Sequence, residues 1–289
     1  MKRLLRGAAL GVIFSLLAGC SAMRVAYENA DTFVRWRATS YLDLHGEAMD
    51  DLNDRIDAFH AWHRAQALPQ YARLAREAAS RIEDGRISPA DIDWGYDAFM
   101  AQVRESLREA AERLAPLLDR LTPEQVQHME ERFGEDNRKF ARENMRGSEK
   151  ERRNLRFKRT RERLEDWVGD LSDAQLDRVR RFADETPLFA ELRDRDRKRL
   201  QAQFLEIVRE RQAQKRLAEV ALDWTRGRDP AYAAASEAFR KAYFVLLGDL
   251  DRMLEARQRG RFVARLRAFA EDFAALSAAG RERGEARAR

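Results

Sequence analysis

The sequence predicts an all-α protein, an elongated bundle of long helical hairpins that follows a cleaved signal peptide. Apolar residues recur at spacings of three and four along most of the chain, which is the period of an amphipathic helix. The 289 residues include only 14 Gly and 6 Pro, the residues that helix interiors disfavour. A hydrophobic fraction of 44% is enough for a packed core. The single cysteine excludes an intramolecular disulfide and a cysteine-cluster metal site.

Residues 1–19 have the parts of a signal peptide. Lys2, Arg3 and Arg6 form a basic start, and residues 7–17 form an apolar run. That run is shorter than the roughly 20 residues that a membrane-spanning helix needs, and it fits the apolar region of a secretory signal. Removing residues 1–19, which carry three positive charges and no acid, lowers the formal net charge of the chain from +5 to +2. A nearly neutral chain makes nucleic acid an unlikely partner, and we expect none.

The signal peptide ends in a sequence that resembles the lipobox of bacterial lipoproteins, Leu17-Ala18-Gly19-Cys20. The resemblance implies cleavage before Cys20 and a covalent lipid on its sulfur, and we expect no other cofactor. Several acyl chains make an anchor stable, since each buried CH₂ contributes about 0.8 kcal/mol. Ser21 in place of aspartate implies the outer membrane of a Gram-negative cell, with the protein facing the periplasm.

The remaining elements follow as helices with recognisable starts. Leu121-Thr122-Pro123-Glu124-Gln125-Val126 combines a capping residue, a first-turn proline and a glutamine that can complete a capping box. Similar starts occur at Ser88 and Ser172, and a degenerate one at 44–49. The apolar stripes cover residues 49–63, 92–114, 126–140, 176–182, 189–221, 232–253 and 262–276.

Helix stops set the expected organisation of the chain. Pro116 should interrupt one helix, whereas the segment 187–224 could be a single helix about 57 Å long at ~1.5 Å per residue. We expect one helical domain over 20–280, with a sub-boundary near 116–122 or 186–188. The tail 281–289 has no apolar anchor and is expected to be disordered.

With these motifs assembled, the chain resembles an uncharacterised family of Gram-negative lipoproteins that is known as a domain of unknown function. His45 and Ala48 stand where such relatives would have Thr and Gln. Besides Cys20 and the closing Arg-rich helix, the resemblance rests on Phe33-Val34-Arg35-Trp36, Tyr41-Leu42-Asp43-Leu44, Trp62-His63-Arg64, Leu68-Pro69-Gln70-Tyr71, Leu121-Thr122-x-x-Gln125 and Trp167-Val168-Gly169-Asp170-Leu171-Ser172-x-x-Gln175.

The Leu-Thr-x-x-Gln element is also similar to the paired motif of periplasmic chaperones of the Spy/CpxP type. That likeness implies a concave surface that holds unfolded clients, and it is a fold-level analogy. The same residues are also expected at the start of any well-capped helix.

Metal binding and catalysis have only weak candidates. Asp57, His60 and His63 lie one turn apart on a helix and could supply three ligands. His63 also lies on an apolar stripe, however, so a core role is the stronger interpretation, and we expect no metal. The chain has no Gly-x-Ser-x-Gly motif and no phosphate-binding loop. We therefore expect no catalytic residues and no enzyme activity.

Two segments are candidates for recognition. Trp62, His63 and Arg64 are residue types common in binding surfaces, and Tyr41, Trp36 and Tyr71 join them if the first helices pack as a hairpin. The alternative is an aromatic core edge with Arg64 reaching water.

The second segment, 146–163, carries nine Lys or Arg against three acids. Its positive charge could face anionic lipid, or it could form an ordinary solvated helix. The patch residues are Arg152, Arg153, Arg156, Lys158 and Arg159.

Together these features predict a lipid-anchored envelope protein that acts as a non-enzymatic scaffold or binding module. Its partners would be the membrane, through the lipid, and an envelope protein or an anionic lipid. The alternatives are a chaperone-like holdase for periplasmic clients and, with lower weight, a helical hydrolase or metal-binding protein.

Overall fold

A computed structural model describes residues 23–83 and 85–287, with side chains to 280. The predicted all-α class is confirmed: helices make up 86% of the structure, and the part of the chain that it describes contains no strand. A short helical stretch over 23–28 precedes the named helices. In chain order these are α2 (Ala30–Leu42), α3 (Glu47–Trp62), the π-helix η1 (His63–Ala67), α4 (Leu68–Glu83), α5 (Pro89–Leu118), α6 (Pro123–Asn144), α7 (Glu149–Val168), α8 (Asp173–Glu185), α9 (Ala190–Arg209), α10 (Ala213–Leu222), α11 (Pro230–Met253) and α12 (Ala256–Arg287).

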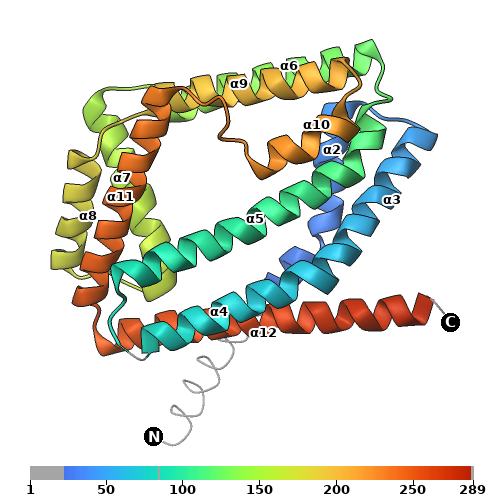
Figure 1. Cartoon of the computed structure of the whole chain (residues 1–289). Coiled ribbons are helices and arrows are strands. Elements are labelled where there is room, and N and C mark those ends of the chain that lie inside the picture. Colours follow the sequence, from blue (N-terminus) through green and yellow to red (C-terminus); the bar gives the residue numbers. More distant parts are fainter. Residues whose placement is uncertain (1–22, 84, 288–289) are drawn as a thin grey trace, which may run out of the picture.

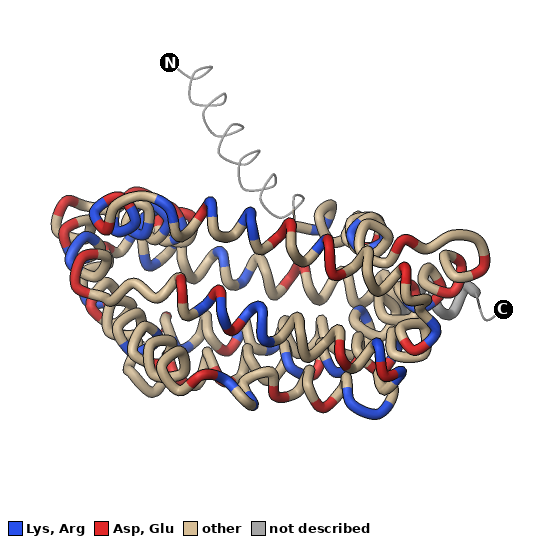
Figure 2. The backbone as a smooth tube through the Cα atoms, turned by 90° about the horizontal axis from the view of Figure 1, so that it is seen from above, with Lys and Arg blue, Asp and Glu red and all other residues tan. Residues whose placement is uncertain are grey.

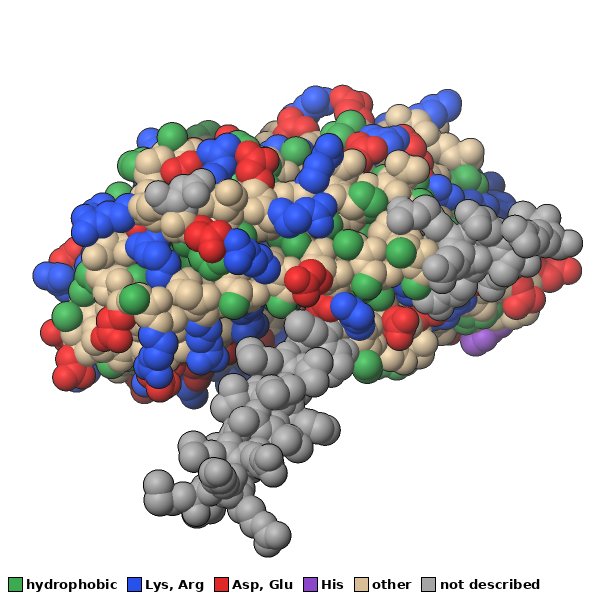
Figure 3. Space-filling model, turned by 90° about the horizontal axis from the view of Figure 1, so that it is seen from below, with side chains coloured by type: hydrophobic (Ala, Val, Ile, Leu, Met, Phe, Trp, Pro, Cys, Tyr) green, Lys and Arg blue, Asp and Glu red, His purple; other side chains and the backbone are tan. Residues whose placement is uncertain are grey.

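The helices pack in pairs that form a four-sided frame (Figure 1). α6 and α9 form one long side, and α4 and α12 form the opposite one. α7, α8 and α11 make one short end, and α2 and α3 lie at the other. α5 crosses the interior with α10 packed against it. Charges of both signs are spread along the whole molecule (Figure 2), and the face shown in Figure 3 is similarly mixed.

Two main apolar clusters hold the ends of the frame. The first joins α2, α3, α5, α6, α9 and α10 around fully buried residues such as Leu52 and Ile207. The second joins α7, α8 and α11 around Val179 and Leu246. The chain leaves the first cluster after α6, returns to it with α9 and α10, and rejoins the second with α11. Each cluster is therefore built from separate stretches of the sequence.

The predicted helix starts are formed by capping boxes. In each box the side-chain oxygen of the capping residue accepts a hydrogen bond from the backbone N–H three residues later. The side chain of that later residue accepts a hydrogen bond from the backbone N–H of the capping residue. The boxes begin at Ser88, Thr122 and Ser172, as expected. A fourth box, which was not predicted from the sequence, begins at Ser148 and is completed by Glu151.

The glutamines of two boxes also reach across to another helix end. The Gln125 amide donates to the carbonyl of Asp43, just after α2, at 3.1 Å. The Gln175 amide donates to the carbonyl of Met253, the last residue of α11, at 3.1 Å. Gln175 is fully buried and also exchanges hydrogen bonds with buried Gln258. Each Leu-Thr/Ser-x-x-Gln motif therefore begins one helix, and its glutamine forms a hydrogen bond to the end of another helix.

Three expectations about helix ends need correction. α5 continues through Pro116 to Leu118, because a proline so close to the end removes little of the remaining hydrogen bonding. The segment 187–224 is two helices, since Arg211 adopts a left-handed φ of 55° and Asp119 caps α10 by accepting from the N–H of Ala213 at 2.6 Å. α12 continues as helix to Arg287, into the tail that we expected to be disordered.

We expect Gln175→Ala to destabilise the protein more than Gln125→Ala. Both changes open a capping box, but only the first also removes two buried hydrogen bonds to Gln258, so that one amide N–H of Gln258 loses its acceptor while the other keeps the Asp170 carbonyl. An unsatisfied buried polar group costs about 1–3 kcal/mol, which sets the expected difference in the free energy of unfolding. Urea unfolding followed by circular dichroism measures it, and equal losses in the two variants would contradict the role assigned to Gln175.

Candidate functional site

A cavity of about 930 Å³ opens between α4, α5, α11 and the loop that joins α10 to α11. Its size lies within the roughly 300–1,000 Å³ typical of small-molecule pockets. α5 supplies the longest stretch of wall, and the beginning of α12 adds Phe262. The site therefore combines residues from distant parts of the chain.

Aromatic side chains dominate the cavity wall. Tyr96 of α5 packs edge-on against Phe244 of α11, with ring centroids 5.4 Å apart. Tyr96 and Phe99 are exposed, so α5 presents uncovered aromatic surface to the cavity. The aromatic lining residues are Trp94, Tyr96, Phe99, Trp224, Phe239, Tyr243, Phe244 and Phe262.

Arginines add positive charge beside these rings. Arg81 lies 4.0 Å from the ring centre of Trp94, and it also pairs with Asp91 at 2.8 Å. Arg240 lies over Tyr96 and pairs with Glu237 at 2.7 Å. Neither guanidinium is therefore free to neutralise an added anion.

Arg104 is different from these two arginines. It is exposed and makes no ion pair with any described residue, and its recorded contact is the ring of Trp224, at 5.7 Å. Asp97, two turns earlier on α5, is an exposed carboxylate on the same wall and is likewise without a counter-charge in the described chain. Among the described lining residues, Arg104 is thus the one positive charge without an ion pair and Asp97 the one negative charge. Of these two side chains, Arg104 lies over an aromatic ring, that of Trp224.

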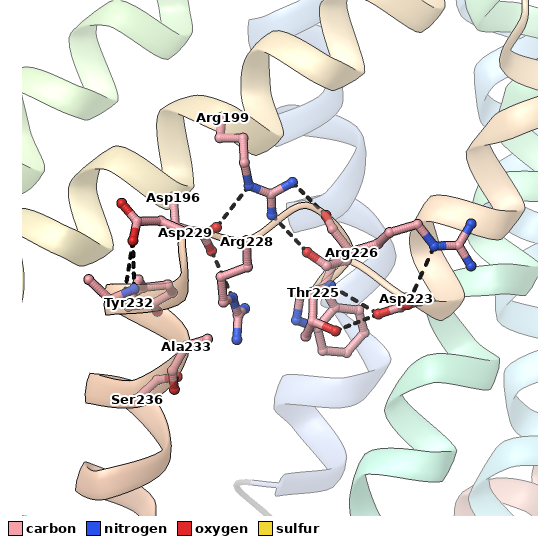
Figure 4. A network of polar contacts seen from close by, with 12 residues as sticks. Asp196, Arg199, Asp223, Thr225, Arg226, Arg228, Asp229, Tyr232, Ala233 and Ser236 are labelled. Carbon is pink, nitrogen blue, oxygen red and sulfur yellow. Dashed lines mark hydrogen bonds and ion pairs between the residues drawn. The ribbon is translucent and has the colours of Figure 1, made fainter.

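The α10–α11 loop that carries Trp224 is held by a polar network (Figure 4). Arg199 of α9 donates to the carbonyls of Trp224 and Arg226, both at 2.9 Å, and to Asp196 at 2.9 Å. Asp196 is buried and also pairs with Arg228 at 3.4 Å. The loop turns through Gly227, whose φ of 73° is disfavoured for other residues. The network holds Trp224 and Arg228 on the cavity wall.

The predicted binding surface around His63 is a packed aromatic cluster. His63 shares a hydrogen bond of 2.7 Å with the Tyr27 hydroxyl and stacks on that ring. Its ring centroid lies 5.7 Å from that of Phe59 and 6.0 Å from that of Tyr71. Tyr71 therefore joins the cluster as expected. A π-helical turn begins at His63 and ends just before Pro69. Because Pro69 has no backbone N–H, it cannot donate the hydrogen bond that a regular α-helix needs at this position.

Burial sets the electrostatics of this cluster. Desolvation lowers the pKa of His63 to about 4 and also lowers that of His60. It raises the pKa of Tyr27 to about 12. All three groups are therefore neutral at pH 7, which suits a structural cluster rather than a charged recognition site.

Arg64 and Tyr41 depart from the predicted surface. Arg64 lies over the ring of Tyr27 and packs so closely against α12 that a Cβ added to Gly280 would lie 3.0 Å from the Arg64 Cβ. Tyr41 contacts Phe133 of α6 and donates a hydrogen bond to Asp136. Tyr41 lies in the last turn of α2, beside the start of α3, whereas Trp62 lies at the far end of α3. The expectation that Tyr41 joins Trp62, His63 and Arg64 is therefore wrong.

The candidate metal ligands do not converge. Asp57 pairs with Arg35 of α2, and the His63 Nδ1 is bonded to Tyr27. Across residues 23–83 and 85–287, no group of three or more His, Cys, Asp or Glu side chains could hold a metal ion.

The basic stretch forms α7, and its arginines contact neighbouring helices. Arg152 pairs with Glu191 of α9 at 2.5 Å. Arg153 donates to the carbonyls of Ala183 and Asp184 at the end of α8. Arg156 donates to the carbonyl of Pro187 at 3.0 Å, and burial lowers its pKa.

The other two predicted patch residues also have partners. Arg159 donates to Asn144 at 2.9 Å, and Lys158 pairs with Glu162 at 3.9 Å. Two of the five patch residues, Arg153 and Arg156, therefore join α7 to the carbonyl-rich end of α8, where cations are favoured.

The lipobox residues Leu17, Ala18, Gly19 and Cys20 lie outside the described residues. No described helix is both long and apolar enough to cross a membrane.

The cavity was not predicted from the sequence. The apolar stripe over 92–114 was interpreted as core, although Trp94-Gly95-Tyr96 places a glycine between two aromatic residues. Nothing lies within 4 Å of the position where a Gly95 Cβ would be, so this glycine leaves open space at the wall.

The fold and the cavity define an all-helical protein with an aromatic-lined site inside a frame of paired helices. A family model, DUF6279, described as a family of unknown function, matches residues 40–232, and the chain belongs to that family. No curated protein and no solved structure matches the chain.

We expect protonation of His63 to destabilise the fold between pH 6.5 and 4. Because the folded state holds the pKa near 4, the unfolded chain takes up this proton first as the pH falls. Stability is therefore full above pH 6.5 and falls by at most roughly 3 kcal/mol as the pH approaches 4.

Urea unfolding at pH 7 and pH 4 measures this loss, with His63→Gln as the control that cannot titrate at this position. His60 is present in both proteins. If the unmodified protein and His63→Gln lost the same stability between pH 7 and pH 4, the assignment to His63 would be contradicted.

Proposed function

We propose that the protein is a lipid-anchored envelope protein that acts as a non-enzymatic binding module at the periplasmic face of the outer membrane. The observation that carries the binding role is the aromatic-lined cavity of about 930 Å³. The anchor is supported by the basic start, the short apolar run and the lipobox that ends at Cys20.

The cavity favours an apolar ligand with an acidic group. Rings from α5 and α11 provide apolar surface, and Tyr96 and Phe99 are already exposed to receive it. Arg104 can pair with an acid because no described carboxylate neutralises it. Its guanidinium lies over the ring of Trp224. The exposed Asp97 is two turns away on α5, so the acid would bind at the Arg104 end.

The chemistry of the wall favours binding over catalysis. Nucleophilic catalysis needs a nucleophile beside a base. The lining hydroxyls are those of Thr225, which donates to the Asp223 carboxylate, and Ser236, which donates to the Ala233 carbonyl. The ionisable lining residues in the described chain are Arg81, Asp91, Tyr96, Asp97, Arg104, Arg228, Glu237, Arg240 and Tyr243, with no His, Cys or Lys among them. Several of these are already engaged in ion pairs with one another.

A holdase for unfolded clients is the second candidate. The exposed apolar residues of α5, Tyr96, Phe99 and Leu107, favour it, because a client's apolar segment could pack on them. A holdase would slow the aggregation of reduced insulin at stoichiometric amounts and without a cofactor. Unchanged aggregation by light scattering would contradict this role and leave the small-ligand role.

We expect Gly95→Phe to close the binding site. Its new ring would enter space that is now open, and replacing a helical glycine costs no helix propensity. The anionic aromatic dye 1-anilinonaphthalene-8-sulfonate is the probe, because it combines rings with a sulfonate. The variant should weaken saturable dye binding about tenfold or more, which is 1.4 kcal/mol, and Arg104→Ala should also weaken it.

Gly260→Phe is the matched control. Gly260 also lies inside a helix, nothing lies within 4 Å of its Cβ position, and it is outside the cavity wall. Fluorescence titration should give this control the affinity of the unmodified protein. Equal affinities of the two glycine variants would contradict the cavity as the binding site.

A further inference from the structure

We propose that the N-terminal helical segment lies on the surface of the bilayer and that Val25, Phe33 and Trp36 enter the interface between headgroups and acyl chains. This inference rests on the proposed lipid at Cys20. It goes further by assigning a second membrane contact and therefore an orientation of the frame on the membrane.

These three side chains share one face of the helical segment. Spacings of eight and eleven residues from Val25 place Phe33 and Trp36 within one side of a 3.6-residue helix. The helical hydrogen bonds continue across Asn29, which donates to the Val25 carbonyl at 3.1 Å and accepts from the Phe33 N–H at 3.2 Å. The rings of Phe33 and Trp36 contact each other, with centroids 5.8 Å apart.

The face is strongly exposed and carries no charge. Val25, Phe33 and Trp36 are 57%, 63% and 62% exposed. The exposed residues between them on this face are Asn29 and Thr32, both uncharged. An uncharged helix face with aromatic side chains is typical of segments that lie in a membrane interface.

Three arginines of the segment hold its other sides to the frame. Arg24 pairs with buried Asp272 of α12 at 2.6 Å. Arg35 pairs with Asp57 of α3, and Arg37 pairs with Asp136 of α6 at 3.0 Å. Because these pairs reach three different helices, the apolar face cannot rotate inward without breaking them.

The length of chain before this segment identifies the bilayer as the occupant. The described residues begin at Met23, and Val25 is only five residues after Cys20. Five extended residues span at most about 18 Å. A lipid on Cys20 therefore holds Val25, at the start of the apolar face, within about 18 Å of the lipid. Burying the aromatic rings in the interface stabilises the contact, because it removes apolar surface from water.

An environment-sensitive nitrobenzoxadiazole label on Phe33→Cys tests the contact. Acylation blocks the thiol of Cys20, so the label attaches only to the introduced cysteine. The lipidated full-length protein is reconstituted into phosphatidylethanolamine–phosphatidylglycerol vesicles, with and without a lipid that carries a quencher in its acyl chain. Val245→Cys is the matched control, because Val245 is an apolar residue that is 58% exposed but lies on α11. Mass spectrometry of the mature N-terminus verifies the lipid.

We expect the label at position 33 to shift its emission to the blue on vesicles and to be quenched several-fold by the acyl-chain quencher, while the label at position 245 changes in neither respect. Equal, weak quenching at both positions in a protein that is lipidated and floats with the vesicles would overturn the docking and leave the anchor intact. A blue shift at position 33 that occurs without vesicles, together with a doubled mass in sedimentation, would overturn it in favour of a second copy of the chain. An unmodified Cys20 would remove the anchor, and with it the basis of this inference.

Discussion

The frame depends on the close packing of α4 against α12. These two helices come from opposite ends of the chain, and small side chains let them approach: Ala72, Ala75 and Ala79 of α4 and Ala270 of α12 are buried. Short side chains allow two helix axes to lie close together, so that long stretches of both surfaces are removed from water. The pair forms one complete side of the frame, and it places the start of α12 beside α7 (Figure 1).

Closure of the frame produces the cavity. α5 must cross the interior to connect α4 with the first apolar cluster, and α10 covers only part of its length. The aromatic residues near its start are therefore only partly covered: Tyr96 packs against Phe244 of α11, and both Tyr96 and Phe99 stay exposed at the cavity. The loop before α11 completes the wall because Arg199 binds two of its carbonyls. The cavity is thus a product of helix arrangement, and no single motif encodes it.

Arginine has several structural roles in this fold. Its planar, multivalent donor group can bind helix-end carbonyls, pair with carboxylates and lie over aromatic rings, and its long apolar stem packs along the way. Arg153 and Arg156 bind the end of α8, and Arg81 contacts both a ring and a carboxylate. A dense run of arginines is therefore compatible with a small net charge, which is +2 over residues 20–289. The charge pattern alone could not separate this use from binding to an external anion.

The sequence by itself determined the helical class, three of the four capping boxes of the described residues, and the family. These features depend on local spacing or local hydrogen bonds, so neighbouring residues are enough to specify them. Only the tertiary structure decided that Tyr41 lies far from Trp62, that Asp119 divides the segment 187–224, and that the stripe around Tyr96 borders a cavity. An apolar stripe shows that a face avoids water, but what covers that face depends on helices distant in the chain. The same reason explains why the exposed face of Phe33 and Trp36 became recognisable only after their neighbours were placed.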